Sequence, residues 1–147
     1  MIAQAERKSP TLPPRAAQRS GLPQVLVVDD DECMRELLNL HLWQAGYDVC
    51  LAEDAIEAGH LLLKAVPDVM IVDINMPYMN GFEFVTAVRA DRTIPFIPVI
   101  FLTAHKDAGT RAREFGALFL LKPVHAERLL DTVAASTANL RPQSQAA

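Results

Sequence analysis

The stretch VMIVDINMP, residues 69–77, places Asp73 at the end of a run of four apolar residues. The stretch VLVVDDD, residues 25–31, repeats this arrangement near the N-terminus and contains Asp29 and Asp30. Short apolar runs that end in polar turns predict buried strands. The carboxyl ends of parallel strands meet at one edge of an open α/β sheet, and ligands bind there. The two stretches therefore predict a working site in which these aspartates lie together.

From residue 24 onward, short apolar runs alternate with segments of helical period, which predicts a parallel sheet with crossover helices. The expected strands cover residues 25–28, 47–52, 69–72, 99–102 and 118–121. The expected helices cover residues 34–45, 54–65, 82–90, 110–115 and 126–138. Because the strands are apolar at successive positions, we expect helices to cover both faces of the sheet.

Composition divides the 147 residues into one domain and two tails. Half of the residues are apolar, which suits a single domain with one core. Residues 1–23 are basic and rich in proline and predict a disordered arm, followed by a domain over 24–138 and a tail over 139–147. The formal charge is −4, but the arm holds four basic residues against one acidic residue, which leaves −7 on the remainder. The arm could contact an acidic partner or the domain itself, although a solvated tail is the simpler interpretation.

Charge and residue content argue against several classes of function. An acidic domain is a poor candidate for binding nucleic acid unaided. No apolar stretch approaches the roughly 18 residues of a membrane span, and the N-terminus lacks the core of a signal peptide, so we expect a cytoplasmic protein without membrane contact. Cys33 and Cys50 have no disulfide or metal-ligand spacing and are expected to be packing residues.

Polar residues stand at the ends of four expected strands, namely Asp29 with Asp30, then Asp73, Thr103 and Lys122. Three carboxylates held close together repel one another unless a cation compensates them. Mg²⁺ suits such a site, because it binds one or two carboxylates and keeps positions open for water and a phosphate oxygen. Lys122 adds a positive charge and Thr103 a hydroxyl donor. The set is typical of a site that holds a phosphoryl group.

Four motifs in this order resemble the receiver domain of two-component response regulators over about residues 24–136. They are VVDD at 27–30, DINMP at 73–77 with Gly81, LTA at 102–104, and KP at 122–123. Four ordered motifs on the expected elements are far more specific than any one of them. The resemblance, to single-domain chemotaxis regulators in particular, implies a flavodoxin-like (βα)5 fold with five parallel strands in the order 2-1-3-4-5 and helices on both faces.

The resemblance also implies a separate role for each residue in and near the first two motifs. Asp73 would be the nucleophile that attacks a phosphohistidine or a small acyl phosphate and becomes an aspartyl phosphate. Asp30, Asp73 and the backbone carbonyl of Asn75 would bind Mg²⁺, with Asp29 acting largely through water. His105 and Asn75 occupy positions that tune the lifetime of the phosphate in this family.

The other two motifs would bind the phosphoryl group and respond to phosphorylation. Lys122 would neutralise phosphoryl oxygens, and the peptide bond before Pro123 would be cis. Thr103 would shift inward on phosphorylation, and Phe119 would fill the space left behind, a switch role that rests on the resemblance alone.

The sequence departs from the family between Thr103 and Lys122, where it has fewer residues than receivers usually have. The shortage falls on the fourth helix, which Gly109 also weakens. We therefore expect a shortened fourth helix and an altered output face.

The favoured interpretation is a stand-alone phosphoacceptor that catalyses only its own phosphoryl transfer and dephosphorylation. Its partners would be a histidine kinase or histidine phosphotransfer protein and a downstream protein target, with self-association as a homodimer left open. The alternatives are a receiver-like interaction module that no longer depends on phosphorylation, and a fragment of a larger regulator or hybrid kinase. A phosphohydrolase is disfavoured because Asn75 stands where such enzymes carry a second acid. An FMN protein is disfavoured because an acidic loop repels phosphate unless a metal is bound.

Overall fold

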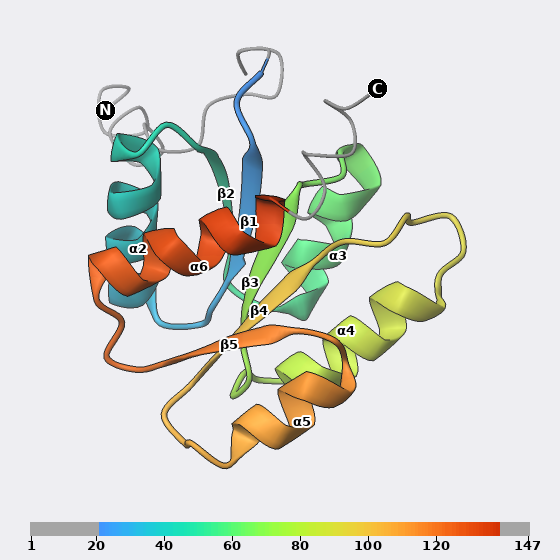
Figure 1. The fold of residues 1–147 in the computed structure, drawn as a ribbon. Coiled ribbons are helices and arrows are strands. Elements are labelled where there is room, and N and C mark those ends of the chain that lie inside the picture. The colour runs from blue at the N-terminus through green and yellow to red at the C-terminus, as the bar shows by residue number, and fades with distance from the viewer. Residues whose placement is uncertain (1–20, 139–147) are drawn as a thin grey trace, which may run out of the picture.

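The computed structural model describes residues 21–138, and most of the expected arm and the whole expected tail lie outside this range. The described residues form one five-stranded parallel sheet in the order β2-β1-β3-β4-β5. Helices cover both faces of the sheet (Figure 1). The expected flavodoxin-like (βα)5 fold and its strand order are confirmed.

All ten expected elements form, with ends that differ from expectation by a few residues. The strands are β1 (Gln24–Val28), β2 (Asp48–Ala52), β3 (Val69–Asp73), β4 (Val99–Thr103) and β5 (Leu118–Leu121). The helices are α2 (Glu32–Gln44), α3 (Ala55–Lys64), α4 (Gly81–Ala90), α5 (Ala108–Glu114) and α6 (Ala126–Ala138). The fourth of these helices, α5, has seven residues and is the shortest. None of the helices between residues 21 and 138 has the length and hydropathy needed to cross a membrane.

Side-chain caps fix where the helices begin. Asp31 caps α2 by accepting from the backbone N–H groups of Cys33 and Met34, and Asp54 caps α3 by accepting from the backbone N–H of Glu57. Asn80 and Glu83 form a capping box at the start of α4, in which each side chain accepts from the other's backbone N–H. Gly46, with φ of 97°, ends α2 in the left-handed conformation that glycine adopts without steric cost. These caps set the loops that lead from the strand ends into the helices.

The core has two layers, one on each face of the sheet. Alternate residues of a strand point to opposite faces, so in β1 Val25 and Val27 pack with α2 and α6, while Leu26 and Val28 pack with α3, α4 and α5. The central strands β3 and β4 are buried along their whole length. Their carboxyl ends are therefore held in a rigid frame.

Burial differs from expectation at two places. Helices cover both faces of the sheet, but cover is incomplete along β5, where Leu118 and Leu121 are exposed because this strand lies at the edge of the sheet. Cys33 is exposed rather than a packing residue, because it lies in the first turn of α2 on the side away from the sheet. Cys50, in β2, is half-buried and packs against the core as expected.

Gly109 has a packing reason for its place in α5. A Cβ atom at this position would lie 2.6 Å from Cε1 of Phe119. The Phe119 ring, half-buried on β5, thus packs directly against the helix backbone. The glycine that weakens α5 as a helix also makes room for the aromatic side chain of the neighbouring strand.

Gly81 allows α4 to start directly over the end of β3. Its N–H donates to the carbonyl of Ile74 at 2.8 Å, and a Cβ atom here would lie 2.6 Å from the carbonyl oxygen of Asp73. Since this neighbour is backbone, no side-chain rearrangement can relieve the contact. The glycine therefore fixes the distance between the helix and the strand end that carries Asp73.

We predict that Gly81→Ala lowers the free energy of unfolding by about 1–3 kcal/mol, the usual cost of overpacking. Gly59→Ala is the matched control, because a Cβ at this position in α3 meets nothing within 4 Å. Alanine there should raise stability by roughly 0.5–1 kcal/mol, since it is the better helix former. Urea unfolding of both variants measures the difference. Equal effects of the two substitutions would contradict the close approach at Gly81.

Candidate functional site

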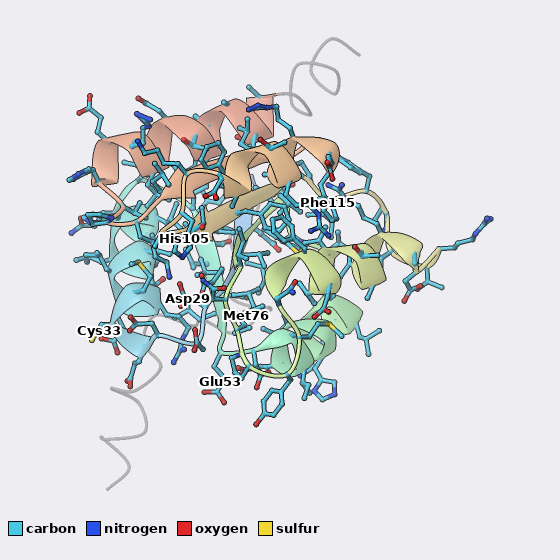
Figure 2. All side chains as sticks on the ribbon, turned by 90° about the horizontal axis from the view of Figure 1, so that it is seen from below. Asp29, Cys33, Glu53, Met76, His105 and Phe115 are labelled. Carbon is cyan, nitrogen blue, oxygen red and sulfur yellow. The ribbon has the colours of Figure 1, made fainter. Side chains whose placement is uncertain are left out.

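Three carboxylates meet at the carboxyl edge of the sheet. Asp29 follows β1 and is fully buried, Asp73 ends β3 and is 3% exposed, and Asp30 is exposed in the loop before α2. One carboxylate oxygen from each lies within 4.8 Å of the other two. Figure 2 looks onto this edge, where Asp29, Met76 and His105 lie on loops from three different strands. The structure thus brings together the three acids that the sequence placed at one edge.

Lys122 supplies the positive charge of the site from the end of β5. Its Nζ lies 3.2 Å from Oδ1 of Asp73 and 3.5 Å from Oδ2 of Asp29. Its backbone N–H donates to the carbonyl of Thr103 at 2.8 Å, so β4 holds the residue in place. The peptide bond to Pro123 is cis, as expected. One ammonium group is shared between two buried carboxylates.

The remaining residues of the expected set lie around this centre. Thr103 is buried at the end of β4, and its hydroxyl accepts from the N–H of His105 at 3.0 Å. Asn75 and His105 are exposed on the β3–α4 and β4–α5 loops, which follow two neighbouring strands. Phe119 belongs to the α5 side of β5 and packs with the core rather than with the acids.

Two contacts that sequence reasoning missed hold Asp29 in position. The N–H of Asp31 donates to Oδ1 of Asp29 at 2.9 Å. Arg35 reaches back from the first turns of α2 and donates from Nη1 to the carbonyl of Asp29 at 2.7 Å. A basic residue one helical turn after the N-cap was the available signal, but such residues are also common on solvated helix faces. These two donors make the turn after β1 rigid.

Burial and crowding raise the pKa values of the two buried acids. Desolvation is the larger cause for Asp73, the negative charge of Asp29 adds to it, and Lys122 opposes both, so that the pKa of Asp73 rises from 3.8 to about 6. Desolvation also raises the pKa of Asp29, against the opposing effects of the Asp31 N–H and Lys122. Both acids are therefore held in an environment that disfavours their charged forms.

The same pocket favours the charged form of Lys122, whereas it disfavours the charged forms of the two acids. Desolvation lowers the pKa of its ammonium group, but the charges of Asp73 and Asp29 outweigh this effect and the net pKa is raised. Lys122 is therefore firmly cationic at neutral pH. One cation does not balance three carboxylates, so the site keeps excess negative charge.

The donor set fits a hard divalent cation. Oδ2 of Asp29 is buried and accepts no hydrogen bond, although it lies near Lys122. Carboxylate oxygens are the ligands that Mg²⁺ prefers, and a cation among them would relieve both the repulsion and the unsatisfied acceptor. The oxygens of Asp29, Asp30 and Asp73 are close enough to surround one ion.

We predict that Asp73→Asn raises the free energy of unfolding at pH 7 in a metal-free buffer, by up to about 3 kcal/mol for a pKa that rises from 3.8 to about 6. A carboxyl whose folded pKa is raised stabilises the fold fully below its unfolded pKa and loses that contribution as pH rises through its folded pKa. The gain should therefore vanish near pH 4 and grow up to about pH 7. Urea unfolding across this range measures it, and Asp131→Asn, at an exposed position of α6, is the control. A gain that does not change with pH would contradict the charge assignment.

Comparison with known proteins places the chain in a family. Residues 25–134 match the response regulator receiver domain. The chain is 32% identical to the DNA-binding dual master transcriptional regulator RpaA of Synechocystis sp. over 78% of this chain and 48% of that protein. It is 34% identical to the response regulator MprA of Mycobacterium avium over 83% of this chain and 54% of that protein. The chain therefore spans about half the length of these curated relatives.

Solved structures agree with the sequence matches. Chemotaxis protein CheY4 of Vibrio cholerae superimposes with a TM-score of 0.73 at 39% identity, over 79% of this chain and 99% of that structure. A response regulator receiver domain protein from Clostridium thermocellum superimposes with a TM-score of 0.75 at 26% identity, over 83% and 99%. Fold, ordered motifs and matched residues lead to one conclusion: this chain belongs to the response regulator receiver domain family.

Proposed function

We propose that this protein is a phosphoacceptor of a two-component system, phosphorylated on Asp73. The observation that carries the proposal is the position of the Asp73 carboxylate, at the end of β3, beside Lys122 and among two further acids. A carboxylate nucleophile needs a positive charge that receives the incoming phosphoryl oxygens, and Lys122 lies 3.2 Å away. Receiver domains are signalling proteins rather than enzymes with a separate substrate, and the proposal is of that kind.

A magnesium ion completes the proposed site. The carboxylates of Asp30 and Asp73 and the backbone carbonyl of Asn75 would hold it, with Asp29 acting through water. When bound, the ion would supply positive charge that neutralises the carboxylates and the incoming phosphoryl group. The buried, unsatisfied oxygen of Asp29 and the raised pKa of Asp73 support this assignment, because both features are relieved by a cation.

The proposed step is an in-line transfer. An oxygen of Asp73 forms a bond to phosphorus while the bond from phosphorus to the donor breaks, a P–N bond in a phosphohistidine or a P–O bond in an acyl phosphate. The leaving imidazole takes up a proton, whereas the leaving carboxylate needs none. Lys122 remains protonated and holds the phosphoryl oxygens, because its pKa is raised rather than lowered.

The partners and the readout follow from the same proposal. A histidine kinase or histidine phosphotransfer protein in the cytoplasm would donate the phosphoryl group, and the phosphorylated form would dock on a downstream protein. Thr103, buried at the end of β4, would donate its hydroxyl to the phosphoryl group instead of keeping its contact with the His105 segment. Phe119 would respond through its packing against Gly109 in α5.

The chain spans only about half of each of these curated relatives, so the activities of the whole relatives are not carried over. DNA binding is a property of RpaA as a whole protein. A receiver-like module independent of phosphate remains the alternative, and the buried acid pair with its lysine speaks against it, since a pure docking module has no need for charges that burial destabilises.

We predict that the full chain, incubated with Mg²⁺ and acetyl phosphate, gains one phosphoryl group and that Asp73→Asn gains none, because the nucleophile is lost. Asp30→Asn should keep the acceptor but require a higher Mg²⁺ concentration, because an exposed ligand is removed. Intact-protein mass spectrometry measures the adduct across a Mg²⁺ titration. A phosphoryl adduct on the Asp73→Asn variant would show that the acceptor is wrongly assigned.

We predict that His105→Ala and Asn75→Ala each change the rate at which the phosphorylated protein loses its phosphoryl group. Both residues are exposed on the loops that follow β3 and β4, where they would control the approach of water to the phosphorus. The decay of the phosphorylated form in excess EDTA, followed by mass spectrometry, measures this rate. His60→Ala on α3 is the control and should leave the rate unchanged. Decay at the wild-type rate in both loop variants would remove the tuning role.

A further inference from the structure

The surface between α3 and α4 carries a groove of about 570 Å³ that the phosphoacceptor site does not use. Ile56, Leu63 and Tyr78 line it and are 58%, 75% and 83% exposed. Contiguous exposed apolar surface on a soluble domain marks a place where another surface docks. Figure 1 shows the two helices side by side on the face of the sheet opposite α6.

One end of the groove is formed by Tyr78. Its φ is 71°, in the left-handed region that glycine and asparagine adopt readily and tyrosine rarely does. Strained backbone of this kind persists where the surrounding structure holds it, often at ligand sites. The exposed Tyr78 ring gives this end an aromatic surface, and Met79 and the buried Phe84 are further apolar residues of the lining.

The other end of the groove is acidic. Asp91, the C-cap of α4, is the one charged residue among the lining residues that the structure describes. The N–H and the hydroxyl of Thr93 both donate to its Oδ1, at 2.9 and 2.6 Å. These two bonds orient the carboxylate and use only one of its oxygens. The groove therefore offers an apolar, partly aromatic path that leads to a single fixed negative charge.

Proline-rich segments with a basic residue have the complementary chemistry. A polyproline II helix has three residues per turn and binds aromatic-lined grooves without a large loss of conformational entropy. In the sequence PTLPPR, residues 10–15, Pro10 and Pro13 are three residues apart and share one side of such a helix, and Arg15 follows them. The segment belongs to a basic stretch of an otherwise acidic chain. We propose that residues 10–15 dock into the α3–α4 groove of their own chain, with Arg15 at Asp91 and Pro10 toward Tyr78.

The path of the chain supports the direction of this docking. The N–H of Gln24, the first residue of β1, donates to the Asp68 carboxylate at 2.7 Å, so β1 begins beside the segment that follows α3. Both crossover helices run against the strands, and their C-terminal ends, with Asp91, therefore lie at the end of the molecule where β1 begins. Arg15 is closer to β1 along the chain than Pro10 is, which places it at the acidic end of the groove.

The proposed segment is about as long as α3, and the linker that joins it to β1 is long enough to reach the groove. The nine residue-to-residue steps from Arg15 to Gln24 can span about 30 Å when extended, which is enough to pass around the end of α3. Residues 10–15 as a polyproline II helix cover about 15 Å. The ten residues of α3 have a length of about 15 Å as well.

Paramagnetic broadening of backbone amide signals tests the proposal in the full chain. A nitroxide is placed at Ser9→Cys or at Ala16→Cys, in both cases with Cys33→Ser and Cys50→Ala. The label at position 9 should broaden the amides near Tyr78 and the start of α4, and the label at 16 those near Asp91. Amides of α2 and α6, on the other face, should stay sharp. Broadening in the reverse order, on both faces alike or on neither would overturn the docking.

Matched variants separate specific docking from chance contact. Leu63→Glu introduces charge at a well-exposed groove position and should abolish the broadening, whereas Leu40→Glu, at a half-exposed position on α2, should leave it unchanged. Arg15→Glu should weaken it, and combination with Asp91→Arg should restore it by exchanging the two charges. Broadening that survives Leu63→Glu would contradict the groove as the site. Broadening that appears only between labelled and unlabelled copies would show docking between chains and overturn the intramolecular assignment.

Discussion

The arrangement of the whole domain serves one electrostatic constraint, the confinement of two buried carboxylates beside a single ammonium group. Asp29 and Asp73 lose hydration at the ends of β1 and β3, and the charge of Lys122 offsets only part of that loss. The fold must supply stability elsewhere to hold this centre together. Two fully buried layers of apolar side chains, one on each face of the sheet, do so.

The strand ends can carry such a centre because the frame around them is rigid. The register of β1 against β3 and of β3 against β4 fixes the relative heights of the residues that follow each strand. The N–H of Asp31 and the guanidinium of Arg35 hold the turn after β1, and Gly81 lets α4 approach the backbone of Asp73 closely. The excess negative charge of this rigid site suits a divalent cation, which adds positive charge. The bound cation then offers a partner to the negatively charged oxygens of a phosphoryl group.

The β3–α4 loop links the phosphoacceptor site with the groove on the α3–α4 surface. Asn75 lies on the loop near the acids, and Tyr78 forms the end of the groove three residues later. A segment seated against Tyr78 therefore contacts the same loop that borders Asp73. The short helix α5 and the exposed edge strand β5 lie on the opposite side of the site, where Gly109 and Phe119 are in close contact. The two surfaces differ in composition, since one is lined by apolar side chains with a single acid and the other borders an exposed strand edge.

The sequence by itself determined the elements, their order and the residues at the carboxyl edge, because apolar runs, helical periods and ordered motifs are local properties of the chain. It therefore predicted that Asp29, Asp30, Asp73 and Lys122 meet. Only the tertiary structure decided what depends on distance and solvent access: the sharing of Lys122 between two acids, the role of Arg35, the exposure of Cys33 and of β5, and the packing of Phe119 against Gly109. The α3–α4 groove is also decided only by the tertiary structure, because its walls come from two helices and a loop that meet only when the crossover helices pack on the sheet.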